Sequence, residues 1–269
     1  MATHTARARR GGVAMVAVVA TAAALVLVGS IGNAAVVATV PLGTSANYAV
    51  LAGSTVTNTG NSTLDGSLGL WPGSSITGFP PGQVLPPGTT DTTNAAAQQA
   101  QSDLTAAYVD AAGRPLDATT TADLGNLTLA PGVYAGPSKG ALGLTGPLTL
   151  DGEGDPNAVF IFQTDSELIT ASDSTVTLIN GAQPCNVFWQ VGSSATLGTN
   201  SVFVGNILAL TSITVNSGVT VRGRALARNG AVTLSNDTFT NAACTSTPTT
   251  TAPPAPPVSA VPAAPNFTG

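Results

Sequence analysis

The sequence has little charge and a single histidine. Asp, Glu, Lys and Arg make up 8% of the 269 residues, and the formal net charge is -5. The histidine, His4, lies in an N-terminal segment that we expect to be removed, so the mature chain lacks the most common general base and metal ligand. The chain also has no basic patch that would bind nucleic acid. We therefore expect no cofactor, no bound metal, no catalytic residues and no nucleic-acid partner.

The N-terminal segment has the pattern of a signal peptide. Arg7, Arg9 and Arg10 precede an apolar run at residues 13–28, and this run is short for a membrane span. We predict a signal peptide over residues 1–38, cleaved after Ala34 or Ala38. The mature protein is then secreted, without membrane contact.

The C-terminal segment, residues 245–269, is rich in Thr, Pro and Ala. Such a composition cannot bury a core, so we expect a disordered tail. A tail of this kind can also display a domain on a cell surface, if an anchor follows it. The ordered domain is predicted to span residues 39–244.

Residues 186–241 form three rows of similar pattern, at 186–205, 206–223 and 224–241. Each row contains an apolar run, an apolar-Thr-apolar triplet and a third short strand, with Gly or Asn at the corners. Three short strands in about 18–20 residues are what one turn of a triangular β-solenoid needs. The sequence therefore predicts a mainly β protein with an irregular three-faced solenoid, or β-helix.

Threonine dominates the expected outer surface. Side chains alternate between the two sides of a strand, so the threonine of each triplet points outward. On the second face this predicts a ladder of Thr177, Thr196, Thr214 and Thr233. On the third face we expect Thr199, Ser217, Thr220, Thr238 and Thr240, with Val202, Val204 and Arg222 in the same outward columns.

The first strand of each row is apolar on both sides, which indicates a face that is covered. One segment, residues 92–112, has the spacing of a long helix, with Asp91 or Thr92 available as its cap. Its apolar stripe is Ala96, Ala100, Leu104, Ala107 and Ala111. We predict that this helix packs alongside the solenoid, over Phe188, Leu208 and Leu226.

The two cysteines, Cys185 and Cys244, flank the three rows. An even count in a secreted protein suggests a disulfide. Stacking places the two residues about three turns apart, roughly 14 Å at about 4.8 Å per turn, so the chain after Asn241 would have to fold back. The sequence alone leaves this pairing open.

Two clusters of charged residues are candidates for calcium binding and for polysaccharide cleavage. Asp151, Glu153 and Asp155 alternate as calcium ligands do, but the remaining loop ligands are missing, which favours a solvated turn. Near the last turns lie Arg222, Arg224, Arg228 and Asp237. A polysaccharide-cleaving β-helix enzyme needs paired carboxylates, and only one acid is present there.

Five stretches carry a family resemblance, and together they span residues 42–241: 42–52, 129–134, 159–163, 186–192 and 223–227. They resemble the widespread microbial ice-binding proteins. The resemblance implies an irregular three-sided β-solenoid with one long helix alongside. It also implies a secreted, antifreeze-like monomer whose partner is the ice crystal surface. Such a protein would show thermal hysteresis and inhibit ice growth and recrystallisation.

The resemblance also bears on the choice of face. Some family members carry Thr-(Ala/Gly)-x-(Thr/Asn) on the ice-binding face, and Ser217-Gly-Val-Thr220 and Thr59-Gly-Asn-Ser62 are near matches. The third face is therefore the first choice for the ice-binding surface, and the second face is its rival. An adhesin or a glycan-binding solenoid on a cell surface is the alternative function.

Overall fold

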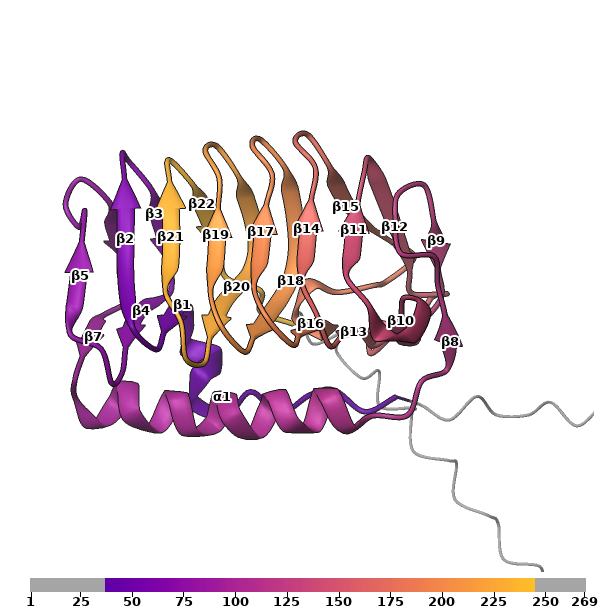
Figure 1. Cartoon of the computed structure of the whole chain (residues 1–269), viewed down its shortest axis with the longest axis horizontal. Helices are drawn as coiled ribbons and strands as arrows, with labels where there is room; N and C mark the ends of the chain where they lie inside the picture. The colour runs from indigo at the N-terminus through magenta and orange to yellow at the C-terminus, as the bar shows by residue number, and fades with distance from the viewer. Residues whose placement is uncertain (1–36, 245–269) are drawn as a thin grey trace, which may run out of the picture. The chain divides into compact units, whose positions relative to one another are not determined.

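The computed structural model describes residues 37–244. The predicted tail at 245–269, and the predicted signal peptide except for its last two residues, lie outside the described residues. The described chain forms a three-faced solenoid of parallel strands with a single long helix beside it (Figure 1). This confirms the fold predicted from the repeating rows.

The three faces each consist of parallel strands, one from each coil of the solenoid. Face a, beside the helix, contains β8 (Ala118–Thr119), β10 (Gly132–Ala135), β13 (Phe160–Thr164), β16 (Val187–Val191), the second halves of β18 (Val202–Ala209) and β20 (Thr220–Ala227), β1 (Tyr48–Ala52), β4 (Ser67–Leu70) and β7 (Thr90–Thr92).

Face b contains β11 (Leu142–Leu144), β14 (Leu168–Thr170), β17 (Ala195–Leu197), β19 (Ile213–Val215), β21 (Val232–Ser235), β2 (Thr55–Thr59) and β5 (Ser75–Thr77). Face c contains β9 (Thr128–Leu129), β12 (Pro147–Asp151), β15 (Thr175–Ile179), the first halves of β18 and β20, β22 (Thr238–Thr240), β3 (Thr63–Asp65) and β6 (Gln83–Leu85). Faces a, b and c correspond to the first, second and third faces of the sequence rows.

The coils do not stack in the order of the chain. The N-terminal strands β1, β2 and β3 pair with β20, β21 and β22 of the last coil. The N-terminal coils therefore extend the solenoid beyond its C-terminal coil. Helix α1 (Ala95–Gly113) returns along face a from β7 at that end to β8 at the other (Figure 1).

The helix begins three residues later than predicted. Asn94, rather than Asp91 or Thr92, is its N-cap, and Asn94 Oδ1 accepts a 2.9 Å hydrogen bond from Ala97 N. Asp91 and Thr92 belong to β7, because Gly69 and Leu70 of β4 pair with them. Ala97, not Ala96, is buried. The helix therefore starts later than the local capping signals predict, because strand pairing holds the predicted cap residues in β7.

The predicted contact between the helix and face a is confirmed. Leu104 is fully buried in one cluster with Phe188, Leu208 and Leu226. Buried glutamine amides add polar links: Gln101 Nε2 donates to Ala227 O at 3.1 Å, and Gln163 Nε2 donates to Ala111 O at 2.8 Å. The helix is thus held by apolar contacts and by hydrogen bonds to its own backbone and to that of the strands.

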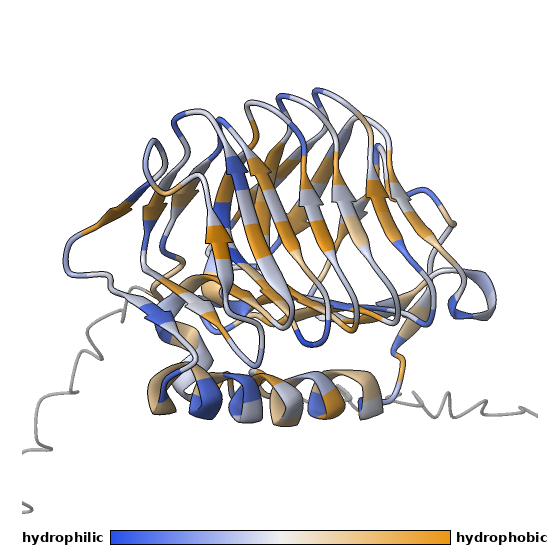
Figure 2. Cartoon of the chain, turned by 60° about the vertical axis from the view of Figure 1, so that its left-hand side comes forward, coloured by the Kyte–Doolittle hydropathy of each residue, from blue (hydrophilic) through white to orange (hydrophobic). Residues whose placement is uncertain are grey.

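The solenoid interior is filled by side chains from all three faces. Figure 2 shows apolar and polar residues alternating along the strands, as alternation between core and surface requires. Four aromatic rings follow one another along the interior: the centroid separations are 5.8 Å for Tyr134 and Phe162, 4.1 Å for Phe162 and Trp189, which are both stacked pairs, and 5.0 Å for the tilted pair of Trp189 and Phe203. The coils are therefore packed together by rings as well as by strand pairing.

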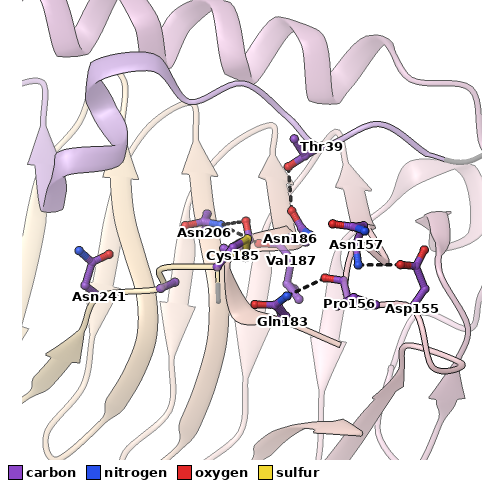
Figure 3. Close-up of a disulfide and its surroundings, with 12 residues drawn as sticks. Thr39, Asp155, Pro156, Asn157, Gln183, Cys185, Asn186, Val187, Asn206 and Asn241 are labelled. Atoms are coloured by element: carbon purple, nitrogen blue, oxygen red, sulfur yellow. Dashed lines mark hydrogen bonds between the residues drawn. A yellow bond between two sulfur atoms is a disulfide. The ribbon is translucent and has the colours of Figure 1, made fainter. Parts of the chain in front are cut away.

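The chain after β22 folds back along the edge between faces a and c. Cys244 forms a disulfide with Cys185, with the Cα atoms 5.3 Å apart. Cys185 lies in the 3-10 turn η3 (Pro184–Asn186), and the next residue, Asn186, accepts a 2.9 Å hydrogen bond from Thr39 Oγ1 (Figure 3). The N-terminal and C-terminal ends of the described chain therefore meet at the same edge.

Candidate functional site

Face b carries one continuous column of threonines. Strand register aligns five of them across five neighbouring coils: Thr77, Thr57, Thr233, Thr214 and Thr196. The column continues into Ile169 and Gly143. In β2, β17, β19 and β21 the residues on either side of the threonine, such as Ile213 and Val215, are buried, so the threonine side chains point away from the core.

The other outward side chains of face b are also short, polar and uncharged. Serine hydroxyls tie adjacent coils together: Ala231 N donates to Ser212 Oγ at 3.1 Å, and Ser212 N donates to Ser194 Oγ at 3.3 Å. Along β2, β5, β17, β19 and β21 there is no charged residue. Glu167, just before β14, lies at the end where the threonine column stops. The face is therefore a regular hydroxyl and methyl surface.

The edge between faces b and c is equally regular. Seven successive coils turn there through a residue with positive φ: Gly146, Asp173, Asn200, Gly218, Asn236, Gly60 and Gly78. Glycine, asparagine and aspartate tolerate this conformation, so these seven coils turn alike. Thr199 and Ser217 lie in these turns, beside Asn200 and Gly218, rather than on the strands of face c.

Face c contains the other threonines of the first-choice site. Thr220 and Thr238 occupy one column, and Thr240 lies opposite Arg222 in the next. Thr177 belongs here too, because β15 pairs with β12 and β18. Its assignment to the second face was wrong: triplets on faces b and c have the same apolar-Thr-apolar form, so sequence pattern does not separate them.

Face c is interrupted in ways that face b is not. Val204, predicted to point outward, is only 1% exposed, and η3 packs beside β18 at this point. Arg222 is exposed and charged, and Asp65 follows Leu64, which pairs with Phe239 of β22. The loop at residues 180–186 leaves the face at the same edge. Face c is therefore neither flat nor free of charge.

The charged residues near the last coils have structural roles. Arg224 is buried and bonds Ala46 O at 2.8 Å and Asn206 Oδ1 at 2.7 Å, and burial lowers its pKa to about 10. Asp237 accepts hydrogen bonds from Ser235 N at 2.7 Å and Val219 N at 3.0 Å. Burial raises its pKa to about 7 despite these donors. The carboxylate thus faces backbone amides rather than a substrate cleft.

The acidic turn at residues 151–155 is stabilised by its own carboxylates. Asp151 Oδ1 accepts from Glu153 N at 2.8 Å, and Asp155 Oδ1 accepts from Asn157 N at 2.8 Å. Within residues 37–244 no three His, Cys, Asp or Glu side chains are grouped so as to hold a metal ion. No helix in that range has the length and apolar character of a membrane span.

Comparison with known proteins agrees with this architecture. Residues 50–240 match the family described as ice-binding-like. An ice-binding protein of Nostoc sp. is 55% identical over 206 residues, covering 76% of this chain and 75% of the relative. The crystal structure of an ice-binding protein from Antarctomyces psychrotrophicus has a TM-score of 0.72 and 40% identity, covering 76% of this chain and 98% of that one.

A second solved structure, an ice-binding protein from an Antarctic biological consortium, has a TM-score of 0.72 and 47% identity, covering 76% of this chain and 91% of that one. These relatives share the solenoid over nearly all of the described residues. The resemblance noted in the sequence is thereby confirmed, and the chain belongs to the ice-binding-like family.

Proposed function

We propose that this protein is a non-enzymatic ice-binding protein and that face b is its ice-binding surface. The observation that carries the proposal is the register of Thr77, Thr57, Thr233, Thr214 and Thr196 on five neighbouring coils. This choice reverses the preference for face c that the sequence motif gave. The reason is that Arg222 and the buried Val204 interrupt face c, whereas the threonine column of face b is unbroken.

The physical basis lies in the rigidity of the array. Neighbouring coils are about 4.8 Å apart and alternate residues of a strand about 6.7 Å apart, so the outward groups form a two-dimensional grid. Threonine supplies a methyl group and a hydroxyl, and its β-branch restricts χ1. A grid of this kind holds surface water in a near-lattice arrangement. Because little conformational entropy is lost on docking, many weak contacts add up to adsorption.

Adsorption to a growing crystal would slow ice growth and inhibit recrystallisation outside the cell. The signal-peptide pattern at residues 1–38 supports secretion. The monomer is the expected form, because one solenoid already presents the whole of face b. The alternative, a cell-surface adhesin, uses the same face against ice or glycan and differs in having a membrane or wall anchor.

The test compares one protruding side chain on each face. Thr214 and Thr220 are both half-buried strand residues, and a tyrosine at either position stands above the surface and separates it from a planar crystal. We expect Thr214→Tyr to abolish most of the thermal hysteresis and Thr220→Tyr to retain most of it, with unchanged circular dichroism in both. The reverse ranking would assign ice binding to face c. Equal and negligible losses would exclude both faces.

A further inference from the structure

A polar groove lies at the edge between faces a and c, among the N-terminal coils and away from face b. It consists of two adjoining recesses of about 330 and 430 Å³ that share Asn47 and Ser67. Asp65, Pro87 and Asn241 line the first recess, and Tyr48, Asp91 and Gln99 contribute to the second. Each volume lies within the range typical of small-molecule sites, about 300–1,000 Å³.

The first recess is built from segments far apart in the chain and is held rigidly. Arg224 Nη2 donates a 2.8 Å hydrogen bond to Asn241 Oδ1, which leaves Asn241 Nδ2 as the donor available to a ligand. Asn241 N donates to Asp65 Oδ2 at 3.3 Å. Because Arg224 is buried and the disulfide at Cys244 restrains the segment that follows, the amide of Asn241 is oriented before any ligand arrives.

The wall of the second recess is also fixed. Asp91 accepts hydrogen bonds from Tyr48 Oη at 3.0 Å, Thr89 Oγ1 at 2.9 Å and Asn94 Nδ2 at 2.8 Å. Both carboxylate oxygens of Asp91 are therefore occupied, so this residue shapes the recess rather than binding a metal. Asp91 in turn holds the hydroxyls of Tyr48 and Thr89 in place.

The lining selects one chemical class of ligand. Its two carboxylates, without a lysine or arginine among the lining residues, disfavour anions such as phosphate. A calcium ion needs six to eight oxygens, and Asp65 is the one carboxylate that still has capacity. The lining offers amides, hydroxyls and a carboxylate. These groups match ligand groups that both donate and accept hydrogen bonds, and the hydroxyls of a neutral sugar are such groups.

We propose that this groove binds a neutral saccharide, one ring in each recess, so that the ligand is the size of a disaccharide. Asp65 accepts hydrogen bonds from the sugar hydroxyls, Asn241 donates to them, and Asn47 contacts both rings. The site is independent of face b. A sugar bound there would leave the ice-binding surface free, so a variant can lose sugar binding and keep ice binding, or the reverse.

The experiment titrates the ¹⁵N-labelled full chain with cellobiose, maltose and trehalose in turn, followed by amide NMR. We expect saturable shifts of the side-chain amides of Asn47 and Asn241 with at least one of the three sugars. Asp65→Asn, which keeps the shape and removes the charged acceptor, should weaken binding about tenfold. The matched control is Asn157→Ala, an exposed asparagine outside the groove, which should bind as the wild type does.

Two outcomes would overturn the proposal. One is the absence of saturable shifts with all three sugars, and the other is wild-type affinity in Asp65→Asn. If Asp65→Asn does not fold, as judged by circular dichroism, Asn47→Ala replaces it, because Asn47 is exposed and the same loss is expected. Thermal hysteresis measured on the same variants should stay at the wild-type value, which separates this site from face b.

Discussion

Arg224 and Asn241 are joined by a 2.8 Å hydrogen bond that ties the last coil to the segment folded back over it. Arg224 is 6% exposed and also bonds Ala46 O and Asn206 Oδ1. One guanidinium therefore links the N-terminal turn, two coils and the C-terminal segment. This planar five-donor group is suited to such a role, because it satisfies several carbonyl oxygens at once.

Replacing Arg224 with Met should destabilise the fold by about 3 kcal/mol, because several buried oxygens lose their donor. Urea denaturation followed by circular dichroism measures the change in the free energy of unfolding. Arg222→Met is the matched control. That residue is exposed on face c, and its loss should change stability by no more than about 0.5 kcal/mol. Similar values for the two variants would mean that Arg224 is not the link described here.

The disulfide should contribute through the unfolded chain. The two cysteines are 59 residues apart, and closing a loop of that length is worth about 4 kcal/mol in the chain-entropy model. The double variant Cys185→Ser, Cys244→Ser should be less stable by about that amount. Under reducing conditions the wild type should fall to the stability of the variant. A wild type that is insensitive to reductant would contradict this.

The helix interface predicts a contrast between two residues on different faces of α1. Leu104 is fully buried against face a, whereas Val109 is 61% exposed. Leu104→Ala should cost about 2–5 kcal/mol because it leaves a cavity, and Val109→Ala should cost less than about 0.5 kcal/mol. Thermal melting provides the comparison. Leu104→Asp should be worse still, since it buries an unpaired charge.

Asp237 should make stability depend on pH in an unusual direction. Its pKa in the folded protein, about 7, lies above the ordinary value of 3.8, so the fold binds the proton more tightly than the unfolded chain does. Its contribution is therefore fully present below about pH 4 and is lost as pH rises toward 7, by up to about 4 kcal/mol. The difference in unfolding free energy between wild type and Asp237→Asn, measured from pH 4 to 8, isolates this dependence. A difference that does not change with pH would contradict it.

The threonine column of face b ends at Ile169, which is 46% exposed. Ile169→Thr extends the column by one coil, and we expect thermal hysteresis to increase because the matched surface grows. Ile179→Thr on face c is the control, since Ile179 is 38% exposed and lies outside the column. An increase in the control as large as in Ile169→Thr would argue against face b.

The sequence predicted the architecture well because the signal is local and repeated. Each row of residues 186–241 carries its own strands and corners, so the coil could be recognised one row at a time. The stacking of β1 on β20 could not, since it joins residues such as Val50 and Ala225 that are far apart in the chain. The local sequence pattern of either strand does not indicate which strand it pairs with.

The candidate site was predicted less well for a related reason. The triplets around Thr177 and Thr196 have the same form, but register places Thr177 on face c and Thr196 on face b. Likewise Val204 alternates as an outward residue should, yet it is buried where η3 packs. A strand pattern tells which side of a strand faces the core, and only the corners tell which face of the solenoid it belongs to.

The meeting of Thr39 with Asn186 and of Cys244 with Cys185 gives the domain a defined point of attachment. Both ends of the described chain leave from the edge between faces a and c, which is the vertex of the triangular section opposite face b. A fluorescent label, a bead or a second domain joined at either end would therefore sit behind face b. Surfaces coated through these ends would present the threonine grid outward, all in one orientation.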